Sequence, residues 1–166
     1  MSMPTNFLDL HIVDYCQLDC RHCYLNKGNA SMPLEMIKEV CLNFLQTDLP
    51  LQQNAIVLSG GEPLLHPQFS EVCDTIRNLN RHITLSSNGI LIPQYIDLFR
   101  KNDGIQISID GDNQIHDFIR GKGSYESAIR ALQVLDENKV RHSISFTVNK
   151  QNIISISFIN AFISGT

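Results

Sequence analysis

The chain has 166 residues, of which 43% are hydrophobic and 18% are charged, so it can form one domain with a buried core. Its formal net charge of -4 offers no electrostatic basis for binding nucleic acid or an anionic membrane, and we expect neither partner. No segment reaches the roughly 18–20 apolar residues that span a bilayer, and the first residues lack the basic and apolar regions of a signal peptide.

Strands and helices alternate along the chain. We predict strands at residues 7–13, 55–58, 83–86, 105–109 and 143–148, and helices at 33–46, 68–79, 93–101 and 124–138. Ser31 and Ser124 are the predicted N-caps of the first and last of these helices, and residues 111–123 form a predicted loop. The segment 152–163 fits both a helical and a strand pattern, and we assign it as a helix. This alternation predicts a parallel sheet with right-handed crossovers.

The five cysteines divide into a group of three and two single residues. Cys41 and Cys73 lie at helical spacing among apolar residues, which predicts that both are buried. Cys16, Cys20 and Cys23 fall within eight residues, directly after the first strand. An odd number of cysteines with three crowded into one loop is a poor disulfide framework and favours a reducing, cytoplasmic location.

Three thiolates at C-x3-C-x2-C spacing can bind one metal centre from a single loop. They supply three ligands, one fewer than a closed structural site needs, so an iron–sulfur cluster bound in this way keeps one iron open. The alternative is a zinc site that His22 or a more distant residue completes.

The next strand ends in Gly60-Gly61-Glu62-Pro63. Glycines at this position allow a sharp turn and the close approach of a ligand to the backbone, and Glu62 would present a carboxylate at the mouth of a site, suited to a ligand ammonium. A plain turn with a solvated glutamate is the alternative.

Polar residues also end the third and fourth strands. Asn88 follows the third strand, although Asn-Gly is also a common turn dipeptide. Ser108 and Asp110 would share one face if the fourth strand continued through Asp110, and a carboxylate there suits a ribose diol. Arg120, in a glycine-containing segment, is suited to bind a ligand carboxylate with two nitrogens. A turn and a surface arginine are the respective alternatives. Because parallel strands end at one edge of the sheet, these groups predict one site.

Together, the cysteine triplet, the Gly-Gly-Glu-Pro turn and the Ser108-Ile109-Asp110-Gly111 strand end resemble the radical S-adenosylmethionine enzymes over nearly the whole chain. The stretch from His116 to Ser124 is similar to the branch of sulfatase-maturating enzymes and peptide maturases, whose members usually carry a cysteine-rich C-terminal extension. The resemblance implies an α/β fold, a partial (β/α)6 barrel with parallel strands, over residues 1–166. We expect five strands and an incomplete sixth unit, in either a truncated or a naturally minimal chain.

The resemblance also implies the cofactors and their contacts. Cys16, Cys20 and Cys23 would hold a [4Fe–4S] cluster whose fourth iron binds the amino and carboxylate groups of S-adenosylmethionine. The residues implied to contact this ligand are Gly60, Gly61 and Glu62 at its ammonium, Arg120 at its carboxylate, Ser108 with Asp110 at its ribose, His22 near its adenine, and Asn88.

The chemistry implied is reductive cleavage of S-adenosylmethionine to a 5′-deoxyadenosyl radical, which takes a hydrogen atom from a peptide or protein substrate. A flavodoxin or ferredoxin would supply the electron. The unpaired edge of the fifth strand would invite a dimer or a partner chain. The alternative is a non-catalytic module that binds the cluster or the cofactor and serves as a partner or assembly protein.

Overall fold

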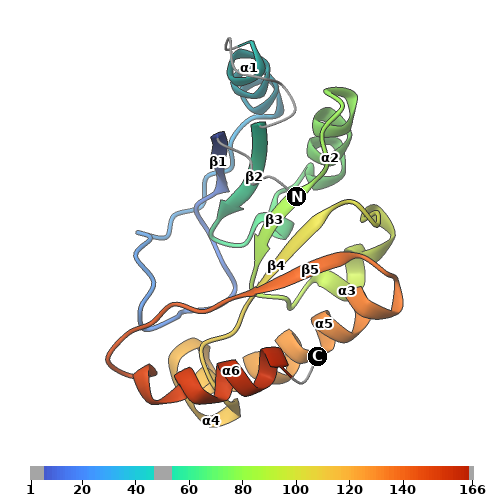
Figure 1. Ribbon diagram of the computed structural model, residues 1–166. Helices are drawn as coiled ribbons and strands as arrows, with labels where there is room; N and C mark the ends of the chain where they lie inside the picture. The colour runs from blue at the N-terminus through green and yellow to red at the C-terminus, as the bar shows by residue number, and fades with distance from the viewer. Residues whose placement is uncertain (1–5, 47–53, 165–166) are drawn as a thin grey trace.

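The structure, a computed structural model, describes residues 6–46 and 54–164. Its strands form one parallel sheet in the order β1-β2-β3-β4-β5 (Figure 1). The strands are β1 (Asn6–Val13), β2 (Asn54–Gly60), β3 (Thr84–Ser87), β4 (Gly104–Ser108) and β5 (Arg141–Ser145). Within the described ranges, β1 and β5 have no further strand on their outer edges, so the sheet stays open. The predicted partial barrel with five parallel strands is confirmed.

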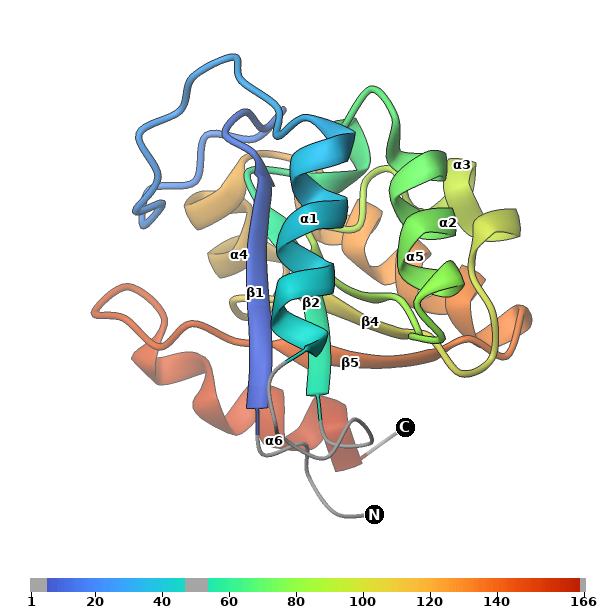
Figure 2. The ribbon, with the colours of Figure 1, turned by 90° about the horizontal axis from the view of Figure 1, so that it is seen from above.

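Helices follow each strand in turn. They are α1 (Leu34–Leu45), α2 (Phe69–Asn78), α3 (Ile92–Tyr95), α4 (Asn113–Arg120), α5 (Ser124–Glu137) and α6 (Ile156–Ser164), with short 3-10 turns η2 (Pro63–Leu65), η3 (Ile96–Leu98) and η4 (Ile153–Ser155). The longer helices gather on the convex side of the sheet, with α1 over β1 and β2 and with α5 and α6 near β5 (Figures 1 and 2). None of the helices in the described ranges has the length and apolar character that crossing a membrane requires.

The core lies between the sheet and these helices. Alternate strand residues such as Leu10, Leu58 and Ile107 are fully or almost fully buried, because successive side chains of a strand point to opposite faces. Asp9 and Gln106, which point to the other face, are exposed. Cys41 and Cys73 are buried, as predicted, and burial raises the pKa of their thiols to about 11 and about 12.

The helix ends differ from the sequence prediction in three places. Residues 113–120, predicted as loop, form α4, which Asp112 caps by accepting a hydrogen bond from the backbone N–H of Ile115 at 3.0 Å. Ser31 does not cap α1, because it forms a bridge with Val13 and Pro33 is the N-cap. Gly123, with a φ of 82°, takes the N-cap position of α5 that we predicted for Ser124.

The remaining differences concern element lengths. β5 begins and ends two to three residues earlier than predicted, because it pairs with β4 from Gly104–Arg141 to Ser108–Ser145. The helix predicted at 93–101 is the shorter pair α3 and η3, and the helical assignment of residues 152–163 is confirmed by η4 and α6. Residues 1–5, on which the expectation about a signal peptide rests, lie outside the described residues.

Candidate functional site

A cavity of about 360 Å³ opens at the carboxyl ends of the strands. All of the predicted site residues except Glu62 and Asp110 line it. These residues are Cys16, Cys20, His22, Cys23, Gly60, Gly61, Asn88, Ser108 and Arg120. The topology therefore brings one loop, three strand ends and one helix end to a single cavity.

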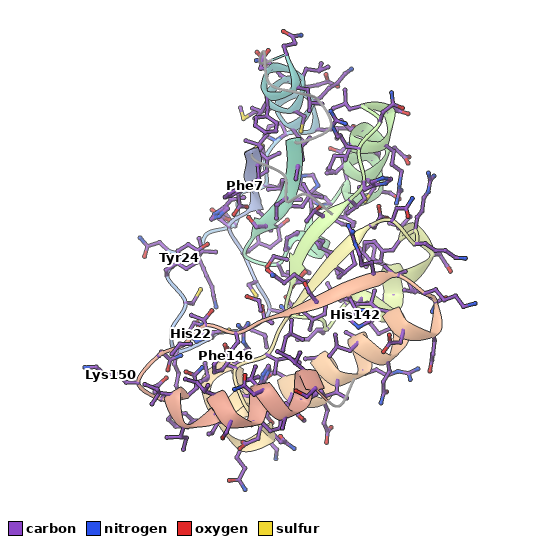
Figure 3. The ribbon with its side chains drawn as sticks, in the orientation of Figure 1. Phe7, His22, Tyr24, His142, Phe146 and Lys150 are labelled. Atoms are coloured by element: carbon purple, nitrogen blue, oxygen red, sulfur yellow. The ribbon has the colours of Figure 1, made fainter. Side chains whose placement is uncertain are left out.

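The cysteine loop runs from the end of β1 to residue 32 and projects from the sheet (Figure 1). Asp14 closes its base: its side chain accepts a hydrogen bond from the N–H of Ala30 at 2.7 Å, and its backbone exchanges hydrogen bonds with Gly28 and Ala30. Figure 3 shows His22 and Tyr24 extending from this loop. Burial raises the pKa of the Cys16 and Cys20 thiols, so a bound cation that favours the thiolate would change their protonation.

The Gly-Gly turn packs against the start of the cysteine loop. A Cβ at Gly61 would lie 2.0 Å from the carbonyl oxygen of Tyr15, and one at Gly60 would lie 2.3 Å from that of Val13. The N–H of Gly61 donates a hydrogen bond to the Val13 carbonyl at 2.9 Å. A side chain at either glycine would clash with the backbone there and prevent this close approach. The two glycines therefore fix the position from which the cysteine loop departs, and they also line the cavity.

Glu62 lies behind the cavity wall, fully buried, and not at the mouth where we expected it. Its carboxylate accepts hydrogen bonds from the N–H groups of Leu64 and Asn88 and from the hydroxyl of Ser87, at 2.9–3.3 Å. Burial raises the pKa of Glu62 to about 7, against the lowering effect of these hydrogen bonds. In this position, Glu62 orients the end of β3, and its contact with a ligand remains a prediction.

Asn88 connects that strand end to the cysteine loop. Its side-chain nitrogen donates to the Cys16 sulfur at 3.6 Å, and its side-chain oxygen accepts from Gln17 at 3.4 Å and from the N–H of Ile90 at 3.0 Å. The amide is thereby held in one orientation beside one of the three thiols. We expected Asn88 among the ligand contacts that the resemblance implies, whereas its hydrogen bond to Cys16 was not predicted.

The end of β4 separates the two residues that we expected to act together. The strand ends at Ser108, which lines the cavity, whereas Asp110 is fully buried behind it. Asp110 accepts a hydrogen bond from Nε of Arg120 at 2.5 Å and one from the N–H of Thr147 at 3.2 Å. Nε2 of His22 lies 3.6 Å from the same oxygen that contacts Arg120.

Sequence reasoning missed the attachment of the cysteine loop to α4. Arg21 donates from its backbone N–H to the carbonyl of Ile119 and from Nε to the carbonyl of Phe118, each at 2.8 Å. Its guanidinium also lies over the Phe118 ring, 4.2 Å from the centroid. The only signal in the sequence was an arginine within the cysteine motif, and nothing marked Phe118 as its partner because α4 was assigned as loop.

The donor set fits an iron–sulfur cluster better than a single metal ion. Three thiols line one cavity, yet within residues 6–46 and 54–164 no three His, Cys, Asp or Glu side chains converge on one ion. A four-iron cluster takes each thiolate on a different iron, whereas zinc gathers four ligands at one point. In addition, Nδ1 of His22 is buried without a hydrogen-bond partner in the described chain, at the wall of this cavity.

Comparison with known proteins finds relatives over most of the chain. Mycofactocin maturase MftC from Mycolicibacterium smegmatis is 32% identical over 143 residues, which are 83% of this chain and 36% of that protein. Fe-coproporphyrin III synthase from Methanosarcina barkeri is 29% identical over 148 residues, 87% of this chain and 37% of the relative. The chain thus spans little more than a third of the length of these relatives.

Solved structures share the fold. Native anSMEcpe with bound AdoMet and Cp18Cys peptide superposes with a TM-score of 0.78 at 20% identity, over 96% of this chain and 47% of that one. Streptococcus suis SuiB bound to precursor peptide SuiA gives a TM-score of 0.62 at 18% identity, over 99% and 46%.

The profile of the Radical SAM superfamily matches residues 10–156, which include the cysteine motif, the Gly-Gly-Glu-Pro turn and Arg120. Proteins of this superfamily bind a [4Fe–4S] cluster and S-adenosylmethionine, and the solved neighbours include complexes with AdoMet. The cavity, its three thiols and the sequence match lead to one assignment: this chain belongs to the radical SAM superfamily.

Proposed function

We propose that this chain is the core domain, over residues 1–166, of a radical SAM enzyme that acts on a peptide or protein substrate. The observation that carries the proposal is the single cavity that three thiols share with the glycine turn, Ser108 and Arg120. One side of this cavity suits a cluster, and the other offers groups for an amino acid joined to a nucleoside.

Each residue has a defined task in this proposal. Cys16, Cys20 and Cys23 would hold the cluster, and one iron would stay available for S-adenosylmethionine. The carbonyl groups of the glycine turn accept from the ligand ammonium, and Arg120 binds its carboxylate. Ser108 meets the ribose, and His22 packs near the adenine. When bound, the two cofactors would supply hydrogen-abstracting 5′-deoxyadenosyl radical chemistry, with one electron from an external reductant.

The protein itself orients these groups. Asn88 holds an amide beside the Cys16 sulfur, and the buried carboxylate of Glu62 fixes the backbone N–H of Asn88. Hydroxyl groups of Ser59, Ser86 and Ser145, from three strands, line the rest of the cavity and are suited to hydrogen bonds with a peptide. A preorganised site of this kind needs little rearrangement during the reaction.

Relatives support the peptide substrate. They include mycofactocin maturase and sporulation killing factor maturation protein SkfB from Bacillus subtilis, and two solved neighbours are complexes with peptides. A flavodoxin or ferredoxin is the proposed electron donor, and a dimer or a partner chain is the proposed occupant of the β5 edge. Five free cysteines are consistent with the reducing cytoplasm as the proposed location.

A second candidate is a non-catalytic module that binds the cofactors without cleaving the ligand. It is favoured by the outer edge of β5, which pairs with no further strand in the described residues and could bind a partner chain. This candidate predicts that the chain binds the cluster or S-adenosylmethionine, as the enzyme does, but releases no 5′-deoxyadenosine.

The test is anaerobic reconstitution with iron and sulfide, followed by addition of dithionite and S-adenosylmethionine. We expect about four irons per chain and release of 5′-deoxyadenosine. Cys20→Ala should lower the iron content sharply, whereas Cys41→Ala, which removes a thiol on the buried face of α1, should leave it unchanged. Cluster loading without any 5′-deoxyadenosine would favour the second candidate, and one zinc per chain with no iron uptake would contradict both.

A further inference from the structure

Asp110 is the point at which four segments of the chain meet. It follows β4, and its own N–H donates to Nδ1 of His116 at 3.1 Å. One carboxylate oxygen contacts the N–H of Thr147 after β5, and the other contacts Arg120 at the end of α4 and lies 3.6 Å from His22 in the cysteine loop. Figure 1 shows the cysteine loop, α4 and the segment after β5 close together at this end of the sheet.

The surroundings of Asp110 exclude it from direct contact with a ligand in the cavity. Its side chain is 0% exposed, and it does not line the cavity, whereas His22, Ser108 and Arg120 do. Both of its oxygens already have partners within the chain. A ribose at Ser108 would therefore meet the strand end without reaching the carboxylate behind it.

The contact with Asp110 orients Arg120. A guanidinium is planar and carries five N–H donors in fixed directions, so a bond from Nε sets the direction of the two terminal nitrogens. Arg120 lines the cavity, and within residues 6–46 and 54–164 no acceptor binds these terminal nitrogens. The edge of the guanidinium that binds a carboxylate in two-pronged fashion is thus left for the cavity.

We propose that Asp110 is a positioning residue: from behind the cavity wall it holds Nε of Arg120 and so aims the terminal nitrogens at the carboxylate of the ligand. The inference rests on the proposed function for the identity of that ligand as S-adenosylmethionine. It replaces the expected contact of Asp110 with the ribose by a contact with the residue that binds the carboxylate.

The test measures the affinity of the reconstituted protein for S-adenosylmethionine and for decarboxylated S-adenosylmethionine, which keeps every group except the carboxylate. Asp110→Asn should weaken binding of the first by about tenfold or more and of the second by less than about twofold, because only the first uses Arg120. Asp103→Asn is the matched control. It alters an aspartate of equal burial that also contacts an arginine, and it should change neither affinity.

Equal weakening of both ligands by Asp110→Asn would overturn the proposal, since it would show general damage to the site. An unchanged affinity for S-adenosylmethionine would overturn it as well. Arg120→Ala distinguishes these failures from failure of the proposed function: if this variant binds both ligands as the wild type does, or if the wild type binds neither, the assigned ligand site is wrong and the inference falls with it.

A second measurement uses the wild-type protein and therefore does not depend on whether an Asp110 variant folds. The Nε–H signal of Arg120 in the ¹⁵N-labelled, cluster-free wild-type protein is assigned by its loss in Arg120→Lys. The hydrogen on Nε of Arg120 should exchange with water far more slowly than the hydrogen on Nε of the exposed Arg130. Exchange as fast as that of Arg130 would overturn the proposal.

Discussion

Strand β4 has a buried aspartate at each end, and each aspartate contacts an arginine. Asp103 precedes the strand and lies 3.1 Å from Nη2 of Arg77, and Asp110 follows it and lies 2.5 Å from Nε of Arg120. The two carboxylates are 1% and 0% exposed, and the side chains of Arg77 and Arg120 are 13% and 11% exposed. By charge and burial alone, the pairs are equivalent.

Their remaining contacts differ. Asp103 accepts from the N–H groups of Ile83 and Arg100, and Arg77 also donates to the carbonyl of Leu98, so that this pair is enclosed by the chain. Arg120 instead lines a cavity, and its terminal guanidinium nitrogens lie on the side away from Asp110. Nε of Arg77 also has no hydrogen-bond partner in the described chain, but it is buried and Arg77 does not line the cavity. The comparison teaches that a buried ion pair marks a site only when the unused donors of one partner open onto a cavity.

The largest effect is expected where the enclosed pair is broken. Asp103→Ala should lower the free energy of unfolding by about 3–5 kcal/mol, because the Arg77 charge then stays buried without its partner. Urea denaturation of the cluster-free protein measures this loss. At a temperature where the variant is folded, its affinity for S-adenosylmethionine should equal that of the wild type. A loss below about 1 kcal/mol would mean that this pair behaves as an exposed ion pair, and it would contradict the description of the pair as enclosed by the chain.

Glu62 sharpens the comparison, because it is a buried carboxylate that accepts hydrogen bonds from Leu64, Ser87 and Asn88 and from no arginine in the described chain. The charge of Arg120 lowers its pKa only as the smallest of several effects. Its pKa, raised from 4.5 to about 7, means that the folded state binds the proton more tightly than the unfolded state does. The stability that it contributes is fully present below pH 4.5 and is lost as the pH rises to about 7. At about 1.4 kcal/mol per pKa unit, this loss is about 3 kcal/mol.

Glu62→Gln should remove that loss. Urea denaturation of the cluster-free protein at pH 5 and pH 8 should show a smaller decrease in stability for this variant than for the wild type. The same decrease in both proteins would assign the pH dependence to another group.

Lysine substitutions test the open and the enclosed arginine. Arg120→Lys keeps a positive charge but loses the planar fork, and it should weaken S-adenosylmethionine binding by about tenfold, or about 1.4 kcal/mol. Arg77→Lys should leave the affinity unchanged and should affect only stability. If both substitutions weaken binding equally, the contrast between the two pairs is incorrect.

The smallest effect is expected at the attachment of the cysteine loop to α4. Arg21→Ala removes the hydrogen bond to the Phe118 carbonyl and the contact with its ring, and it should cost about 1 kcal/mol. Thermal unfolding measures the cost, with Arg130→Ala, on the exposed side of α5, as the control that should not differ from the wild type. Equal melting temperatures for all three proteins would show that this attachment contributes nothing to stability.

The sequence predicted the sheet and the composition of the cavity well, for physical reasons. Buried parallel strands have continuous or alternating apolar patterns, and their carboxyl ends meet at one edge whatever the details of the helices. Ser108, Arg120 and the three cysteines could therefore be assigned to one site before their distances were known.

The sequence could not predict which of these side chains face the cavity and which are buried behind its wall. Glu62 and Asp110 lie at strand ends in the sequence just as Ser108 does. In the structure, the turn after β2 buries the carboxylate of Glu62, and the end of β4 at Ser108 leaves Asp110 behind the wall. Helix α4 was missed because its eight residues lie close to Gly121 and Gly123, and those glycines suggested a loop. The contacts of Arg21 followed from that helix, so they were missed too.

The central claim is that three cysteines hold a four-iron cluster with one iron open to S-adenosylmethionine. The Mössbauer spectrum of the ⁵⁷Fe-reconstituted protein, recorded with and without S-adenosylmethionine, tests it most directly. We predict that about one quarter of the iron signal shifts when the ligand is added, and that this change is lost in Cys20→Ala. A spectrum that S-adenosylmethionine leaves unchanged in a fully loaded wild-type protein would contradict the account.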